Sequence, residues 1–125
     1  MRENDEILKT IKIENMVWIL YLVLIALSFY ANNQEKKYYL FKDEEAKSKY
    51  RTTNIIVFFI ALLVYIYFFN DNYKAVCKLN KTDSPNKIFL ENMNFFATLL
   101  ILIAGTIFLF IAIFDEELET EIAFN

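Results

Sequence analysis

The polar and apolar positions of the chain divide it into three long apolar stretches separated by charged segments. Asn15 to Gln34 has 20 residues without a charge, Thr52 to Asn70 has 19, and Asn92 to Phe114 has 23. A helix that crosses the hydrocarbon core of a bilayer needs about 20 mainly apolar residues. Each stretch is long enough to form one transmembrane helix, and we expect spans at about residues 15–32, 53–70 and 93–114.

The same three stretches argue against a soluble helical bundle. A surface helix of a soluble bundle keeps a polar stripe toward water, whereas these stretches are apolar around the whole helix. A soluble domain of 125 residues also has too high a surface-to-volume ratio to bury three such helices completely. We therefore predict an all-α membrane protein in which residues 1–125 form a single three-span membrane domain.

The first stretch does not have the pattern of a cleaved signal peptide. The apolar region of a signal peptide usually has about 7–15 residues, follows a basic segment and ends in small residues. Here the apolar core has 16 residues, the segment before it carries four carboxylates, and bulky Phe29 stands at the third position before a cut after Ala31. We therefore expect an uncleaved first span.

Capping and pairing patterns predict helices that extend beyond the membrane. Residues 83–85, Asp-Ser-Pro, are typical of a helix start, because an N-cap oxygen precedes a proline in the first turn. Acid and base stand four residues apart at Asp43 with Lys47 and at Glu45 with Lys49, which favours a helix that begins before the second span. We expect this second helix to run from about residue 43 to residue 79.

The expected layout is therefore three long helices that run up, down and up. A loop near Asn32–Lys42 joins the first two helices, and a tight turn near Asn80–Ser84 joins the last two. Apolar residues at helical spacing extend the first helix toward the N-terminus and the third toward the C-terminus, at Ile7, Leu8 and Ile11 and at Phe114, Leu118 and Ile122.

Residues that carry chemistry are scarce. The chain has no histidine, and its single cysteine cannot form an internal disulfide. No Asp, Glu, Lys or Arg lies inside the three apolar stretches, which argues against a proton relay, an ion-coupled transporter and a voltage sensor. No nucleophile stands with a base, so we predict a non-enzymatic protein with no catalytic, cofactor-binding or metal-binding residues and no cofactor.

Small residues follow one line along the third expected helix. Thr98, Gly105 and Ala112 are spaced by seven, and Ala97 and Ala104 lie beside them. Small side chains at heptad spacing leave a shallow groove that another helix approaches closely, at a crossing angle of about +20°. We expect helix packing at these five positions, with a helix of the same chain or of a partner.

Aromatic residues lie near the expected membrane boundaries. Amphipathic rings favour the level of the lipid headgroups, so we interpret five of them as interfacial anchors: Trp18, Tyr30, Tyr65, Tyr67 and Tyr73. An aromatic cage for a ligand is the alternative.

The remaining polar features favour simple interpretations. Cys77 follows the second span and is expected to be a passive thiol, with acylation or an intermolecular disulfide as alternatives. Five carboxylates follow the third span, at Asp115, Glu116, Glu117, Glu119 and Glu121. A helix would spread them around its circumference, so we expect a solvated acidic end rather than a divalent-cation site, with docking to a basic partner as the alternative.

Charge also bears on location and partners. The net charge of −3 gives no basic excess for nucleic acid. In a three-span chain, seven basic residues lie on the same side of the membrane as the N-terminus and six lie on the opposite side. Taken by itself, the third span is asymmetric, with four basic residues in the segment before it and none in the segment after it. That asymmetry favours a cytoplasmic N-terminus in the cell membrane, whereas the first span has the opposite asymmetry. Abundant Lys, Asn, Ile, Phe and Tyr are typical of an AT-rich genome, such as that of a low-GC bacterium or its phage.

These features predict a small membrane protein that works by helix–helix association, as an accessory subunit or as an oligomer. Its expected partners are membrane lipid and either another membrane protein or a second copy of the chain. A pore former is the alternative, because the chain resembles three-span phage holins in size and number of spans. The resemblance covers the general layout and no motif, and the acidic tail differs from the basic tails common in holins. A pore also needs a polar helix face, and these spans offer only scattered Ser, Thr and Tyr.

Overall fold

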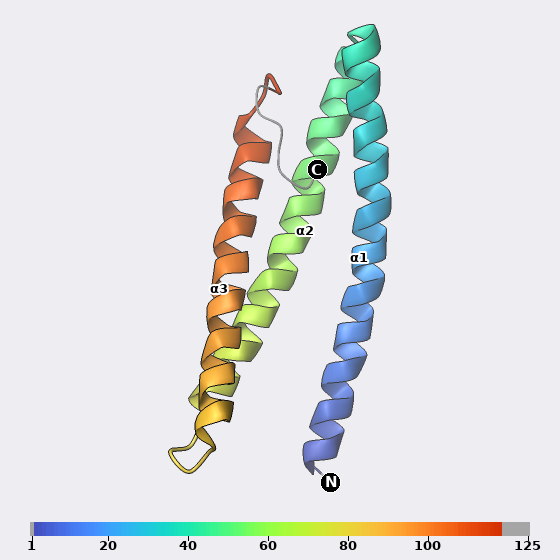
Figure 1. Ribbon diagram of the computed structural model, residues 1–125. Coiled ribbons are helices and arrows are strands. Elements are labelled where there is room, and N and C mark those ends of the chain that lie inside the picture. The colour runs from blue at the N-terminus through green and yellow to red at the C-terminus, as the bar shows by residue number, and fades with distance from the viewer. Residues whose placement is uncertain (1, 119–125) are drawn as a thin grey trace. The chain divides into compact units, whose positions relative to one another are not determined.

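A computed structural model of the protein describes residues 2–118. Three α-helices follow one another in the chain: α1 (Arg2–Phe41), α2 (Glu44–Cys77) and α3 (Pro85–Phe114) (Figure 1). Residues 2–118 contain no β-strand. By length and composition, all three helices are suited to crossing a membrane. The predicted all-helical chain with three candidate membrane spans is therefore confirmed.

The chain divides into two compact units, Met1–Val57 and Phe58–Asn125. The first unit contains α1 and the start of α2. The second contains the rest of α2 together with α3. Each unit is thus a helical hairpin built from neighbouring segments of sequence.

The connection in the first hairpin is shorter than expected. α1 continues to Phe41, so only two residues separate it from α2, and the expected loop at Asn32–Lys42 is wrong. Residues 35–41 contain Glu, Lys and Leu, which favour helix, and no Gly or Pro that would end one. The helix ends instead at Lys42, whose φ of 55° is left-handed and whose N–H donates to the carbonyl of Tyr38 at 2.8 Å.

Hydrogen bonds to a side chain stabilise the start of α2, which lies one residue after the predicted residue 43. A carboxylate oxygen of Asp43 accepts from the backbone N–H groups of Glu45 and Ala46, at 3.0 and 3.3 Å. Asp43 therefore caps the helix, one residue before its first helical residue. The predicted pair of Glu45 and Lys49 is formed, with 3.4 Å between Oε1 and Nζ.

The connection in the second hairpin and the start of α3 follow the predicted pattern. α2 ends at Cys77, two residues before the expected end, and residues 78–84 form the turn. Ser84 is the N-cap of α3, and its hydroxyl accepts from the N–H of Lys87 at 3.2 Å, while Pro85 is the first helical residue. Asp83 accepts from the N–H of Asn80 at 2.8 Å and pairs with Lys87 at 3.6 Å.

α3 ends earlier than the apolar spacing predicts. The helix stops at Phe114, Asp115 has φ −86° and ψ 75°, and Leu118 has a left-handed φ of 54°. The expected helical extension over Phe114 and Leu118 is therefore wrong, and Ile122 lies outside the described residues. Consecutive carboxylates after residue 114 oppose the negative end of the helix dipole, which disfavours further turns.

Few large side chains are buried among the described residues. The buried apolar positions are Leu24, Ala31, Ala46, Tyr50, Val64 and Ala112. Large apolar side chains such as Leu22 and Phe110 are mostly exposed, at 66 % and 60 %. Exposed apolar surface on this scale is unfavourable in water and suits contact with lipid tails. This surface is compatible with a small membrane protein.

Candidate functional site

The part of α2 after Val57 packs against α3 as an antiparallel pair. Aromatic rings meet in reverse order of sequence, Phe58 with Phe108 at 5.8 Å between ring centroids and Phe69 with Phe95 at 5.1 Å. Such ring pairs contribute about 0.5–1.5 kcal/mol each beyond the area that they bury. Their order sets the register in which the small residues of α3 meet α2.

Gly105 of α3 is buried and lies against the side chain of Tyr65 of α2. A Cβ added to Gly105 would lie 2.9 Å from Cδ2 of Tyr65 and 3.5 Å from Cδ1 of Leu62. Any side chain on residue 105 would therefore force the Tyr65 ring to move. The absence of a side chain leaves room for the ring beside Gly105, and close packing of this kind stabilises helix pairs in lipid.

The structure divides the five predicted packing residues into two groups. Gly105 and Ala112 are buried and Thr98 is half-buried, so this line of α3 faces α2 within the chain. Ala97 and Ala104 are exposed. At about 100° per residue, they lie about a quarter of a turn from the line through Gly105. The two alanines are therefore left outside the α2–α3 contact.

A hydrogen bond between asparagine side chains joins α2 and α3 beyond the aromatic contacts. Nδ2 of Asn94 donates to Oδ1 of Asn72, and Nδ2 of Asn72 donates to the carbonyl of Phe68 at 2.9 Å. Tyr73 lies beside this bond, with its ring 6.0 Å from that of Phe95. The sequence marks Asn94 as polar at the edge of a span. It does not identify Asn72 as the partner, because that pairing depends on the helix register.

Hydroxyl groups inside the spans bond to the backbone of their own helix. Ser28 donates to the carbonyl of Leu24 at 2.9 Å, and Thr106 donates to that of Leu102 at 2.9 Å. Thr98 donates to the carbonyl of Phe95 at 2.8 Å. These bonds satisfy the hydroxyl hydrogens without water, as an apolar environment requires.

The five predicted interfacial anchors are placed differently from one another. Trp18 is exposed and meets Tyr21 edge-on, with 5.6 Å between ring centroids. Tyr30, Tyr67 and Tyr73 are also exposed, so they are free to reach headgroups. Tyr65 is half-buried and its ring packs on Gly105, a contact that the sequence does not reveal. The anchor role stays a prediction for all five.

The first hairpin buries polar side chains that sequence reasoning missed. Gln34 and Asn54 are buried, at 7 % and 3 % exposure, and so is Tyr50. Nζ of Lys47 lies 5.4 Å from the centroid of the Tyr38 ring, a cation–π contact between α1 and α2. The available signal was the position of Gln34 and Asn54 at the ends of charge-free stretches, where polar side chains are tolerated.

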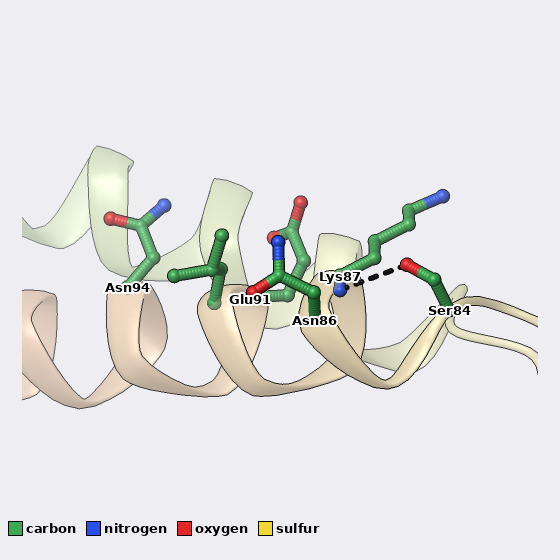
Figure 2. A pocket seen from close by; sticks show the side chains of 6 residues that line it. Ser84, Asn86, Lys87, Glu91 and Asn94 are labelled. Atoms are coloured by element: carbon green, nitrogen blue, oxygen red, sulfur yellow. Dashed lines mark hydrogen bonds between the residues drawn. The ribbon is translucent and has the colours of Figure 1, made fainter.

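The first turns of α3 carry an open depression of about 470 Å³ (Figure 2). Figure 2 shows the Ser84 hydroxyl bonded to the backbone nitrogen of Lys87, with Asn86, Glu91 and Asn94 projecting from the helix. All lining residues come from this one segment, between residues 84 and 94. The depression is therefore a feature of one helix face rather than an enclosed site.

The other chemically reactive side chains that the sequence offers are Cys77 and the acidic residues after α3. Cys77 is a free, exposed thiol at the last residue of α2. Among residues 2–118, no three His, Cys, Asp or Glu side chains are grouped to hold a metal ion. Of the acidic tail, Asp115, Glu116 and Glu117 follow α3, whereas Glu119 and Glu121 lie outside the described residues.

The chain was also compared with known proteins. No protein-family model, no curated protein and no solved structure matches it.

Proposed function

We propose that the protein is a small, non-enzymatic, multi-pass membrane protein that acts through helix–helix association, as an accessory subunit or as a homo-oligomer. One observation carries the proposal. Ala97 and Ala104, seven residues apart, are exposed on α3, outside the line of residues that packs against α2. A second helix, from another chain, is the partner that such a line accommodates.

The neighbours of these alanines give the surface the form of a shallow groove. Leu100 and Ile101 are exposed, at 51 % and 46 %, and by helical geometry they lie on opposite sides of the line through Ala97 and Ala104. A helix that sits on the alanines gains van der Waals contact with both flanking side chains. In lipid, where the hydrophobic effect gives helices little reason to associate, such close contact is the main attraction.

The proposal includes a membrane arrangement. The three helices cross the cell membrane up, down and up as one three-span domain, with the N-terminus in the cytoplasm. The support for this orientation is the third span, which has four basic residues before it and none after it.

Oligomeric state in a mild detergent tests the association. The purified protein, alone or with its co-purified partner, is expected to have a mass above that of one chain by light scattering. Replacing both alanines by leucine (Ala97→Leu with Ala104→Leu) fills the groove and should shift the mass to that of the single chain.

A matched control uses the opposite flank of α3. Thr106 is exposed and also small, but it lies on the other side of the line that faces α2. Thr106→Leu should leave the mass unchanged. A wild-type protein that stays a single chain in detergent and shows no crosslink to any protein in its own membrane would refute the proposal.

A further inference from the structure

Lysines gather where the first hairpin leaves the expected membrane. Lys36 and Lys37 stand two and three residues after the first charge-free stretch, and Lys49 stands three residues before the second. At about 1.5 Å per residue, these distances amount to roughly 3–5 Å beyond the hydrocarbon, which is the level of the lipid headgroups.

The hairpin register brings the lysines of the two helices to one level. Lys47 lies over the ring of Tyr38, which places residues 38 and 47 opposite each other. In antiparallel helices, a step of two residues back from Tyr38 along α1 covers the same distance, in the same direction, as a step of two residues forward from Lys47 along α2. Lys36 and Lys49 are therefore at the same level, and Lys37 is one residue away.

These lysines lie on the outer faces of the hairpin. On α1, Gln34, which is buried, and Tyr38, whose ring lies under Lys47, mark the side toward α2, whereas Lys36 and Lys37 are exposed. On α2, Tyr50 is buried and the side chain of Lys49 is half exposed. The side chains of Lys36 and Lys37 are thus open to the surroundings of the hairpin, and that of Lys49 is half exposed beside Glu45.

Exposed apolar side chains accompany the lysines. Leu40 and Phe41 end α1 with 62 % and 75 % of their surface exposed, and Tyr39 beside them is 50 % exposed. In water these side chains would be unfavourably solvated. Among lipid headgroups, aromatic and basic residues together are the usual composition of a membrane-interface segment.

The acidic residues of the hairpin do not cancel this charge. Residues 35–51 hold six basic and four acidic residues, and three of the four acids are at the tip, residues 43–45. Asp43 serves as the cap of α2, and Glu45 pairs with Lys49 in an exposed contact. Exposed ion pairs of this kind are weak and leave the lysine available to other anions.

We infer that the end of the α1–α2 hairpin binds anionic phospholipids of the membrane that the helices cross. Lys36, Lys37 and Lys49 contact the headgroup phosphates, and Tyr39 lies among the headgroups, with Leu40 and Phe41 at their water-facing edge. The inference rests on the part of the proposed function in which the helices cross a membrane, and not on the orientation of the chain or on its association step.

Tryptophan quenching by brominated lipids tests the inference on the full chain in bilayers. Trp18→Phe with Tyr39→Trp moves the only tryptophan of the chain to the exposed position at the headgroup level of the hairpin end. In mixed bilayers, brominated phosphatidylglycerol should quench it about threefold more strongly than brominated phosphatidylcholine at the same mole fraction. Lys36→Gln, Lys37→Gln and Lys49→Gln together should lower this ratio to about one, whereas the three Lys→Arg changes should keep it.

A control of equal charge separates a local site from diffuse attraction. Lys74→Gln, Lys78→Gln and Lys81→Gln together remove the same charge from the last turn of α2 and the connection to α3, and should leave the ratio unchanged. Three results would overturn the inference. The first is an equal fall of the quenching ratio in both triple variants, and the second is equal quenching by the two lipids. The third is a tryptophan whose emission shows no blue shift and which neither lipid quenches. Loss of the preference on adding inorganic phosphate at constant ionic strength would also overturn it, because the ligand would then be a free ion.

The wild-type chain distinguishes failure of the site from failure of the membrane placement. Trp18 lies within the first charge-free stretch, so both brominated lipids should quench it whether or not the lysines select a headgroup. Quenching of Trp18 without lipid preference at the hairpin end overturns the inference alone. Absence of quenching at Trp18 overturns the membrane placement as well.

Discussion

The ring of Tyr65 occupies the space that a side chain on Gly105 would need. A Cβ on Gly105 would lie 2.9 Å from Cδ2 and 3.1 Å from Cε2 of that ring. Gly105 is the only glycine in the chain, and it stands inside a helix, where glycine is otherwise unfavourable. The contact gives a physical reason for its position there.

Gly105→Ala should therefore destabilise the α2–α3 hairpin. Overpacking of a tight contact costs about 1–3 kcal/mol, which exceeds the gain of about 1 kcal/mol from the better helix propensity of alanine. The destabilisation would appear as a lower unfolding midpoint in an SDS titration that is monitored by near-UV circular dichroism. In a Tyr65→Ala background the obstacle is gone, and the same change should become neutral or stabilising. Equal destabilisation in both backgrounds would contradict the assigned contact.

The hydrogen bond between Asn72 and Asn94 predicts a coupling that a neighbouring asparagine lacks. Asn94→Leu should lower stability by about 0.6–1.7 kcal/mol, the range for interhelical hydrogen bonds in membranes. Asn92 bonds the carbonyl of Ile88 in its own helix at 2.8 Å, so Asn92→Leu serves as the control. A double-mutant cycle by SDS titration should give coupling of Asn72 with Asn94 and none with Asn92. Absence of the first coupling would rule out the bond.

Lys42→Gly should stabilise the first hairpin. A residue other than glycine in the left-handed region costs about 1–2 kcal/mol, partly offset by the greater freedom of glycine in the unfolded chain. The expected net gain is about 0.5–1 kcal/mol, seen as slower amide hydrogen exchange in the last turn of α1. Lys49→Gly, inside α2, should have the opposite effect. Faster exchange in Lys42→Gly would mean that residue 42 does not hold a positive φ.

Production of the protein in a bacterial host should leave the membrane potential unchanged. The hydroxyls of Ser28, Thr98 and Thr106 are bonded to their own helices, so they are poorly placed to form the polar wall of a pore. A voltage-sensitive dye and culture density, with an endolysin supplied, measure the outcome. Abrupt depolarisation followed by lysis would favour the holin-like alternative over the association that we propose.

Local signals of the sequence predicted the helices because each signal acts within a few residues. Charge-free stretches of 19 to 23 residues located the three helices, and the Ser84-Pro85 pair located the start of α3. Capping depends on side chains within one turn, so it can be predicted without knowledge of the fold.

Features that depend on register or on unusual backbone could not be predicted in the same way. Lys42 ends α1 in a left-handed conformation, and a lysine gives no signal of that conformation where a glycine would. The packing of Tyr65 on Gly105 and the bond between Asn72 and Asn94 join residues far apart in sequence. The period of seven in the sequence predicted the five small residues on α3. It did not predict that some of them would face α2 and that the others would be exposed.

The two-residue connection between α1 and α2 has a consequence for how the protein is made. From Phe41 to Glu44 the backbone reaches at most about 11 Å, little more than the 8–10 Å between the axes of packed helices. The start of α2 is thus held beside the end of α1 from the moment both have been synthesised. Their pairing needs no search between separate helices, because the two-residue connection leaves the two helix ends no room to move apart.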